Sequence, residues 1–272
     1  MKSIRYERSY KGPVRAVILD WAGTAVDFGS IGPVAVFQEV FRDSGVEVSV
    51  AEARSPMGLM KKDHIRAMCA MERVAGRWRA VHGRTPDEAD VEAMYSRLEP
   101  LMMMSLARHC DPVPDLFDAL ADFRKLGLKI GSCTGYTGPM MEVLVPEAER
   151  RGYRPDSIVC ATDVPAGRPY PWMCYLNAIR LEVYPLEAMV KIGDTVSDIQ
   201  EGLNAGMWTI GVTRTGNELG LTEEQVNALD PAELEKRLSV IEDRLRLAGA
   251  HFVAGSIGDC PPIIDEINRM MA

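Results

Sequence analysis

Two acidic segments, each placed directly after a short apolar run, are the first candidates for chemistry in this 272-residue chain. One is the D-W-A-G-T segment that begins at Asp20, and the other is the G-D-T-V-S-D segment from Gly193 to Asp198. A carboxylate at a strand end can act as a nucleophile. It can also bind Mg²⁺, which would screen the repulsion between that nucleophile and an anionic substrate. Taken alone, Asp20 could simply cap a turn, and Asp198 could be an acid that favours a helix N-terminus.

A lysine and a histidine three residues apart form the second candidate pair. Both lie in the run P-M-G-L-M-K-K-D-H, where Lys61 and His64 would be neighbours on one helix face. A lysine amine can condense with an aldehyde to give a Schiff base when desolvation or a neighbouring cation lowers its pKa. By composition alone, a solvated lysine and a partly buried histidine are the commoner roles.

These residues need elements that bring them together, and the apolar pattern predicts such elements. Short apolar runs alternate with longer amphipathic segments, which is typical of an α/β fold with a parallel sheet covered by helices on both faces. The runs are Val14–Leu19, Lys129–Cys133, Ser157–Ala161, Met189–Ile192, Thr209–Val212 and His251–Ala254. Ligands of such sheets bind beyond the carboxyl ends of the strands. We therefore expect a site made by the residues that follow the first four runs, namely Asp20, Thr134, Arg168 and Asp194.

One long interval interrupts the alternation of strands and helices. From about Ser30 to about Arg108 the sequence shows no strand-like run and is rich in Met, Arg and Glu at helical spacing. We interpret it as an all-helical cap domain, residues 29–107, inserted into a Rossmann-like doubly wound core made of residues 1–28 and 108–272. The hinges are expected at Asp27–Gly32 and Ala107–Pro112, where Gly, Pro and Asp cluster.

Composition excludes several classes of function. The formal net charge of −8 argues against a binder of nucleic acid or of an anionic membrane, since both need a basic surface. No stretch approaches the roughly 20 apolar residues that cross a bilayer, and the charged segment Met1–Pro13 lacks the apolar run of a signal peptide. The 6 cysteines are scattered without CxxC spacing, so a reducing compartment, the cytoplasm, is expected.

The motifs and their order resemble the haloacid dehalogenase superfamily. Phosphatases of that superfamily carry a second Asp two positions after the nucleophile, where this chain has Ala22. An alkoxide leaving group would then depart without its general acid, a loss of about 10²–10⁴-fold in rate. A protonated imine on Lys61 would remove this need, because it turns a carbanion leaving group into an enamine.

Several blocks are similar to the phosphonoacetaldehyde hydrolase family (phosphonatases) within that superfamily. They are Ala22 in the first motif, the P-M-G-L-x-K-x-D-H run, T-G-Y at Thr134–Tyr136, D-V-P-A-G-R-P-Y-P-W-M at Asp163–Met173, and N-A-G-M-W-T at Asn204–Thr209. The resemblance implies Mg²⁺-dependent hydrolysis of the C–P bond of phosphonoacetaldehyde to acetaldehyde and phosphate. It also implies a Schiff base on lysine, an aspartyl-phosphate intermediate, and a homodimer formed through the insertion.

The site residues that the resemblance implies fall into three groups. The catalytic residues are Asp20 as nucleophile, Lys61 as the imine-forming amine, and His64 for proton transfers. The Mg²⁺ ligands are Asp20, the backbone carbonyl of Ala22 and Asp194, with Asp198 supporting them from nearby. The substrate-binding residues are Met57, Thr134, Gly135, Tyr136 and Arg168. Ser30 stands where the family has Cys and is given no role.

Two other functions remain open at this point. A phosphatase or mutase acting on a sugar phosphate would share the motifs, and Ala22 argues against it. A catalytically silent binding module would share the fold, and the presence of the full set of chemical groups argues against that. Metal-dependent turnover would distinguish an enzyme from a silent module.

Overall fold

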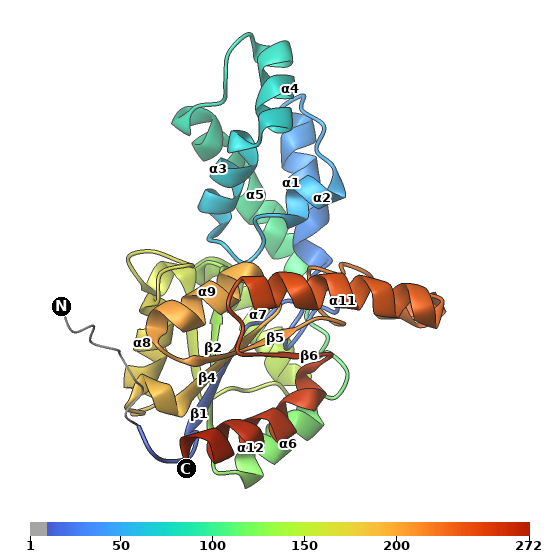
Figure 1. Ribbon diagram of the computed structural model, residues 1–272. Helices are drawn as coiled ribbons and strands as arrows, with labels where there is room; N and C mark the ends of the chain where they lie inside the picture. Colours follow the sequence, from blue (N-terminus) through green and yellow to red (C-terminus); the bar gives the residue numbers. More distant parts are fainter. Residues whose placement is uncertain (1–9) are drawn as a thin grey trace, which may run out of the picture.

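The computed structural model describes residues 10–272, so the first nine residues of the expected core domain lie outside the description. At its centre is a 6-stranded parallel sheet in the order β3-β2-β1-β4-β5-β6 (Figure 1). The strands are β1 Ala16–Leu19, β2 Lys129–Thr134, β3 Ser157–Cys160, β4 Met189–Gly193, β5 Trp208–Val212 and β6 Phe252–Ala254. The predicted α/β fold with a doubly wound parallel sheet is confirmed, and each strand-like run of the sequence forms a strand.

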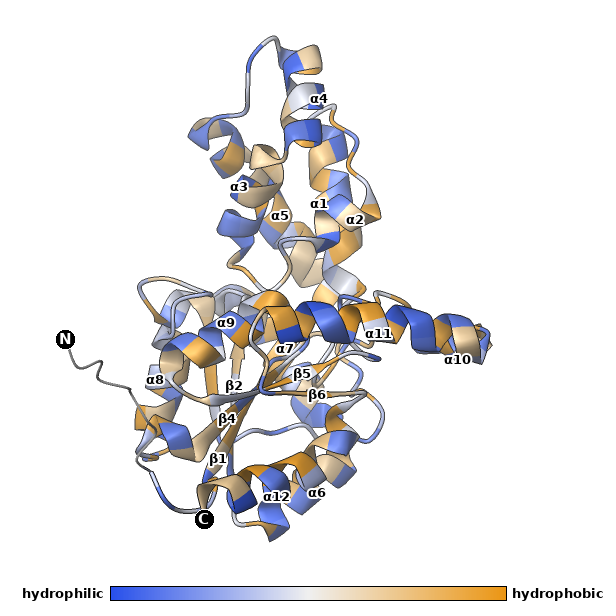
Figure 2. Cartoon of the chain, in the orientation of Figure 1, coloured by the Kyte–Doolittle hydropathy of each residue, from blue (hydrophilic) through white to orange (hydrophobic). Residues whose placement is uncertain are grey.

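The two faces of the sheet are covered by different helices. Val17 and Leu19 of β1 pack into one apolar cluster, and Ala16 and Ile18 pack into the other, as the alternation of side chains along a strand requires. The first face is covered by α6 Leu116–Lys125, α7 Gly138–Arg150 and α12 Cys260–Met271, and the second by α8 Trp172–Arg180 and α9 Val196–Ala205. Helix α10, Glu223–Ala228, precedes α11, Pro231–Leu247, which lies against β6 and α9. Figure 2 shows the strands as mainly hydrophobic and α11 as alternately hydrophilic and hydrophobic.

Local sequence signals explain where two of these helices begin and end. Thr195 is the N-cap of α9, and its side chain accepts a hydrogen bond from the backbone N–H of Asp198. This capping box fixes Asp198 in the first turn of α9, close to the end of β4. Helix α6 ends at Lys125, and Gly127 adopts a left-handed backbone with φ 74° just after the C-cap residue Leu126, which is a common way for a helix to end.

A group of five helices stands beyond the carboxyl ends of the strands (Figure 1). They are α1 Gly32–Asp43, α2 Val50–Arg54, α3 Lys61–Ala70, α4 Glu72–His82 and α5 Glu88–Leu106. We call this group the helical segment. Phe37, Phe41, Met68, Trp78 and Leu98 are buried among these helices and give the segment an apolar interior of its own. The division into a cap of residues 29–107 and a core stays a prediction.

The chain enters and leaves the helical segment through two strips that lie side by side. The N–H of Asp27 donates to the carbonyl of Asp111 at 3.0 Å, and Val26 forms an isolated bridge with Pro112. Asp27 and Ser30 adopt left-handed backbone conformations, with φ 55° and 48°. Both strips coincide with the expected hinge positions.

Within residues 10–272, no helix is both long enough and apolar enough to cross a membrane. The six cysteines are free, and all of them are buried.

Candidate active site

A small cavity lies between the carboxyl ends of the strands and the helical segment. Its empty volume, including space open to solvent, is about 300 Å³, and it is lined by Asp20, Ala22, Ser30, Pro33, Met57, Gly58, Lys61, Thr134, Gly135, Tyr136, Arg168 and Thr195. Most of the residues predicted to form the site therefore meet in one place. The exceptions are His64, Asp194 and Asp198, which lie behind the cavity wall.

Asp20 follows β1 and faces Arg168 across the cavity. Its backbone N–H donates to the carbonyl of Ile192 at 2.9 Å, which continues the β1–β4 pairing for one more residue. The Oδ1 atom of Asp20 accepts from Nη2 of Arg168 at 2.6 Å. Burial, together with the charge of Asp198, raises the pKa of Asp20, and Arg168 opposes that rise. The carboxylate is thus held at the strand end by a single strong ion pair.

Asp194 is fully buried at the end of β4 and completes an acidic cluster. Its Oδ1 accepts from the Thr24 hydroxyl at 3.1 Å, and its Oδ2 accepts from the backbone N–H of Asn217 at 2.7 Å. Carboxylate oxygens of Asp20, Asp194 and Asp198 all lie within 4.8 Å of one another. Burial and the charges of the other two carboxylates raise the pKa of Asp194 well above its usual value. Such repulsion among oxygen donors is relieved by a hard cation, so the donor set fits Mg²⁺.

Asp198 is bound more tightly by the protein than its two neighbours. Its Oδ1 accepts from Lys191 Nζ at 2.5 Å and lies 3.1 Å from Arg168 Nη2, while its Oδ2 accepts from the Thr195 hydroxyl at 2.5 Å. Burial alone would raise the pKa of Asp198, but Arg168 and Lys191 outweigh it and lower that pKa. This bonding leaves Asp198 less free than Asp194 to bind an ion directly.

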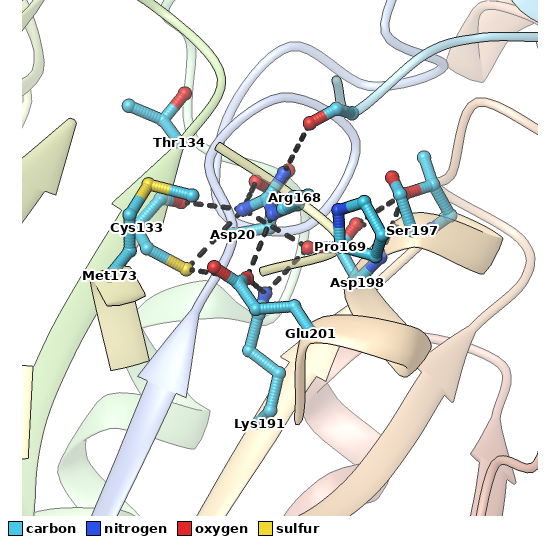
Figure 3. Close-up of polar contacts among 12 residues, drawn as sticks. Asp20, Cys133, Thr134, Arg168, Pro169, Met173, Lys191, Ser197, Asp198 and Glu201 are labelled. Carbon is cyan, nitrogen blue, oxygen red and sulfur yellow. Dashed lines mark hydrogen bonds and ion pairs between the residues drawn. The ribbon is translucent and has the colours of Figure 1, made fainter. Parts of the chain in front are cut away.

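A buried polar network beneath the cavity was not foreseen from the sequence (Figure 3). Lys191 lies on β4 with its side chain fully buried, and its Nζ is 3.8 Å from Oε2 of Glu201 on α9. The same oxygen accepts from Arg168 Nε at 2.8 Å and from the Cys133 thiol at 3.3 Å. One signal was available, because a lysine in the otherwise apolar strand M-V-K-I-G requires a buried partner. Glu201 comes three residues after Asp198 and so lies on the same face of α9.

The charges of this buried cluster do not balance. Four carboxylates face two cationic side chains: Asp20, Asp194, Asp198 and Glu201 against Arg168 and Lys191. All six groups are nearly or fully buried, so water screens their charges poorly. These four carboxylates outnumber the two cations that pair with them, and an excess of buried carboxylates favours a bound cation.

Arg168 donates most of its hydrogen bonds to acceptors within the protein. Its Nε donates to Glu201, one Nη1 hydrogen goes to the carbonyl of Gly58 at 3.2 Å, and Nη2 serves Asp20 and the carbonyl of Cys133. One Nη1 hydrogen therefore remains for another oxygen. Although burial opposes the charge, Asp198, Asp20 and Glu201 raise the pKa of Arg168 well above its usual value. It is a permanent cation that ties the sheet to the helical segment.

Lys61 is the first residue of α3 and projects its amine into the cavity. Its side chain is buried, and Nζ lies 4.4 Å from the ring centroid of Tyr136 and 5.9 Å from that of Phe37. Burial lowers the pKa of Lys61 to about 8; the charge of Asp20 opposes this shift, and Arg168 adds to it. At pH 7 about one molecule in ten would then carry the neutral, nucleophilic amine.

His64 lies one turn further along α3, and its ring is buried. Its Nε2 is 2.8 Å from the carbonyl of Ala53, an acceptor only, so Nε2 carries the proton and donates. The ring stacks on Phe37 with centroids 3.7 Å apart. Burial and the charge of Lys61 lower the pKa of His64 well below its usual value, so the ring is neutral. Its Nδ1 is buried and, within residues 10–272, has no hydrogen-bond partner.

The loop after β2 and the loop before α3 press against each other across the cavity. A side chain at Gly135 would lie 2.5 Å from the carbonyl oxygen of Leu59, and one at Gly58 would lie 2.6 Å from the Thr195 hydroxyl. The Tyr136 N–H donates to the Thr134 hydroxyl at 3.2 Å, which orients the end of β2. Glycine at position 135 lets the backbone after β2 approach the backbone of Leu59, and glycine at position 58 makes room for the Thr195 hydroxyl at the start of α9.

One further cavity residue was given no role by the sequence. Ser30 is 1% exposed, and its hydroxyl has no hydrogen-bond partner in the described part of the chain. Met57 closes the same side of the cavity, and its carbonyl accepts from the Ser197 hydroxyl at 3.2 Å. No spacing pattern in the sequence marks Ser30, because its place depends on the left-handed turn at the hinge.

Comparisons with known proteins agree with this arrangement. Residues 14–206 match the family model for haloacid dehalogenase-like hydrolases. A phosphonoacetaldehyde hydrolase of Nitratidesulfovibrio vulgaris (strain DSM 19637 / Miyazaki F) is 59% identical over 100% of this chain and 97% of its own. One from Syntrophobacter fumaroxidans (strain DSM 10017 / MPOB) is 59% identical over 97% of this chain and 96% of its own. The crystal structure of a phosphonoacetaldehyde hydrolase-like protein from Oleispira antarctica superposes with a TM-score of 0.95 at 40% identity, covering 100% of this chain and 98% of that one.

The parallel sheet, the acidic cluster at its carboxyl edge and the family match define a haloacid dehalogenase-like hydrolase, and the chain is an enzyme of this class. Within the class, two relatives that are 59% identical over nearly the full length of this chain decide to which family it belongs. The chain belongs to the phosphonoacetaldehyde hydrolase family.

Proposed function

We propose that the protein hydrolyses the C–P bond of phosphonoacetaldehyde, giving acetaldehyde and phosphate. The observation that carries this proposal is the buried amine of Lys61 in the same cavity as Asp20 and Arg168. A phosphate ester would use Lys61 only as a cation, whereas an aldehyde substrate needs an amine that is partly neutral near pH 7. The names of the two curated relatives point to the same substrate.

The cycle begins with formation of an imine. The neutral amine of Lys61 attacks the aldehyde carbon, a C–N bond forms, and loss of water leaves a protonated imine. The pKa of Lys61, about 8, supports this step, because a fraction of the lysine is then unprotonated near neutral pH. We assign the buried Nδ1 of His64 as the carrier of a proton: it takes the proton that Lys61 loses before its attack and returns that proton to the hydroxyl that leaves as water.

Phosphoryl transfer to Asp20 follows. A carboxylate oxygen of Asp20 forms a bond to phosphorus while the C–P bond breaks. The electron pair of the C–P bond passes into the adjacent C=N bond and gives a neutral enamine. Arg168 exchanges its ion pair with Asp20 for the oxygens of the transferring group, and Thr134 donates to the same oxygens. The imine thus takes up the electron pair of the breaking bond. The reaction therefore needs no general acid at position 22, where the chain has Ala22.

Two hydrolytic steps return the enzyme to its starting state. Water attacks the aspartyl phosphate, inorganic phosphate leaves, and Asp20 is regenerated. The enamine takes up a proton on carbon, water hydrolyses the resulting imine, and acetaldehyde leaves Lys61. One water is released and two are consumed, so the net reaction uses one water.

Mg²⁺ is the cation that we assign to the acidic cluster, held by Asp20, the backbone carbonyl of Ala22 and Asp194. When bound, it neutralises negative charge at the nucleophile and at the phosphonate oxygens. Asp198 supports the cluster through its bonds to Lys191 and Thr195. The excess of buried carboxylates over Arg168 and Lys191 supports a bound cation.

We assign residues 29–107 as a cap whose docking excludes water from the imine. Met57, Gly135 and Tyr136 then shape the pocket around the two-carbon chain. The proposal includes a homodimer formed through the cap, where Val81 and Met104 are exposed apolar side chains, and a cytoplasmic location.

Product analysis tests the proposal. Purified protein with phosphonoacetaldehyde and Mg²⁺ is expected to release acetaldehyde and inorganic phosphate in equal amounts. Acetaldehyde is followed with a dehydrogenase that consumes reduced cofactor. Chelation of the metal or the substitution Asp20→Asn should abolish both products. Turnover of phosphate esters, without release of acetaldehyde from the phosphonate, would instead identify a phosphatase.

A further inference from the structure

Arg54 reaches out of the helical segment and binds two separate parts of the sheet-bearing region. It is the last residue of α2, and its Nη1 donates to the carbonyl of Gly29 at 2.8 Å and to Oδ1 of Asn217 at 3.0 Å. Its Nη2 donates to the carbonyl of Gly220 at 3.0 Å. These acceptors are uncharged, and within residues 10–272 Arg54 forms no ion pair. The side chain therefore joins the first hinge strip to the loop that follows β5.

Asn217 also donates a hydrogen bond to Arg54, and it links Arg54 to the acidic cluster. Its Nδ2 donates to the carbonyl of Arg54 at 3.3 Å, so the two residues bind each other in both directions. Its backbone N–H donates to Oδ2 of Asp194 at 2.7 Å. Asn217 is 2% exposed, which shields both bonds from water. An unbroken path of hydrogen bonds thus leads from α2 to a carboxylate of the cluster.

The loop that carries Asn217 is packed too tightly to move independently of Arg54. A side chain at Gly216 would lie 2.7 Å from Cβ of Asp194, and one at Gly220 would lie 2.6 Å from Nε of Arg54. The loop is thus held between the acidic cluster on one side and the guanidinium on the other. Removal of the guanidinium would release the side chain of Asn217 and loosen the N–H that orients Asp194.

We propose that Arg54 is a positioning residue that couples docking of the helical segment to cation binding at Asp194. This inference rests on the proposed function in one respect, the assignment of Asp194 as a ligand of Mg²⁺. With Arg54 in place, the N–H of Asn217 binds Oδ2 of Asp194 while the Thr24 hydroxyl binds Oδ1, and the two bonds together fix the plane of the carboxylate. Partners of this kind, one shell beyond the ligand, change metal affinity by about 10–100-fold when removed.

The coupling acts in both directions. Whatever affinity the cation gains from docking, docking gains from the cation, since the two equilibria share one free-energy cycle. Helix α2 is followed by the segment 55–60, and then by α3 with Lys61 at its start. The docking that Arg54 stabilises therefore also places the amine in the cavity. A site without its cation would hold Lys61 less firmly, which delays imine formation until the site is complete.

Direct metal titration without substrate tests the coupling. We compare the parent with Arg54→Met, which removes the hydrogen bonds and keeps most of the volume. The matched control is Arg73→Met, a cap arginine whose side chain, among the described residues, binds Glu52 and Ser49 and forms no hydrogen bond or ion pair with the sheet-bearing region. Mn²⁺, the paramagnetic stand-in for Mg²⁺, is titrated by water-proton relaxation. Arg54→Met should bind Mn²⁺ about 10-fold more weakly than the parent, and Arg73→Met should bind as the parent does.

Two further variants separate coupling from general loss of structure. Asn217→Ala retains the backbone N–H and should weaken Mn²⁺ binding less than Arg54→Met. The double variant should then be no weaker than Arg54→Met, because both changes break one path. Arg54→Lys, which keeps a single donor, should recover part of the affinity. In the parent, Mg²⁺ should slow hydrogen exchange in segment 55–60, and this effect should be lost in Arg54→Met.

Equal Mn²⁺ affinity in folded Arg54→Met and in the parent would overturn the coupling. Losses in Arg54→Met and Asn217→Ala that simply add would also overturn it, since separate paths would then be acting. The proposed function is tested by a separate measurement, the release of acetaldehyde. Mn²⁺ binding that depends on Arg54, in a protein that releases no acetaldehyde, would refute the substrate assignment and leave the coupling standing.

Discussion

At the scale of single residues, protonation of Lys61 would control the first chemical step of the proposed cycle. With a pKa of about 8, the amine is mostly an ammonium ion below that pH and mostly neutral above it. The initial rate of imine formation should rise about tenfold per pH unit below pH 8 and level off above it. Trapping of the imine with cyanoborohydride as a function of pH measures this rate. A rate that climbs steadily beyond about pH 10 would mean that the amine is solvated like an ordinary lysine.

A second prediction at this scale concerns Lys191, because its charge is fully buried between two carboxylates. The substitution Lys191→Met leaves Asp198 and Glu201 without their cation in a dry environment. Breaking a buried pair in this way should lower the free energy of unfolding by about 3–5 kcal/mol.

Chemical denaturation of both proteins measures the effect of Lys191→Met. The control is Lys125→Met, which also removes a lysine 2.7 Å from an aspartate, Asp122, but at an exposed position where the stability should not change. Equal denaturation midpoints for Lys191→Met and the parent would show that the buried network contributes little.

At the scale of elements, contact between the loop before α3 and the core loops depends on Gly58. Its φ is 90°, and a methyl group there would collide with the hydroxyls of Ser197 and Thr195. The substitution Gly58→Ala should therefore hold the helical segment away from the sheet and raise KM for phosphonoacetaldehyde at least about 10-fold.

Gly83→Ala is the matched control for this change. Gly83 has a similar φ of 72°, lies in the same helical segment, and a methyl group there would meet open space. Both variants carry the same backbone strain, so both should lose similar stability, but only Gly58→Ala should change KM. A parallel change of KM in both variants would attribute the effect to strain and not to docking.

The elements of the sheet could be predicted from the sequence because their signals are local. Each buried parallel strand lies in a short, mainly apolar run; Asp20 and Asp194 follow their strands directly, and Thr134 is the last residue of its strand. The contact between Arg54 and Asn217 could not be predicted, since 163 residues separate them and neither belongs to a periodic pattern. His64 shows the intermediate case. Spacing placed it beside Lys61, but its stacking on Phe37 and its bond to Ala53 depend on how α1, α2 and α3 pack.

At the scale of the whole molecule, folding concentrates more negative than positive charge at one edge of the sheet. A cation that binds only the folded state raises stability by about 2.7 kcal/mol at 100 times its dissociation constant. Mg²⁺ should therefore raise the melting temperature of the parent.

The variant Asp194→Asn should show no such rise, because it lacks a ligand. Without metal it should melt above the parent, since burial and two neighbouring carboxylates disfavour the charge of Asp194. Scanning calorimetry of the parent and of Asp194→Asn, each with and without Mg²⁺, gives the four melting temperatures. A metal-free Asp194→Asn protein that melts below the parent would contradict the charge imbalance described for this cluster.

The central claim is that Lys61 forms an imine with the substrate, and reductive trapping tests it most directly. The protein is incubated with phosphonoacetaldehyde, reduced with borohydride, digested and mapped by mass spectrometry. We expect an ethyl or phosphonoethyl group on Lys61 and none on its partly exposed neighbour Lys62, which pairs with Glu92. Lys61→Arg should abolish both the label and the turnover, while Lys62→Arg should retain both. Full turnover by Lys61→Arg, or a label on any other lysine, would contradict the mechanism.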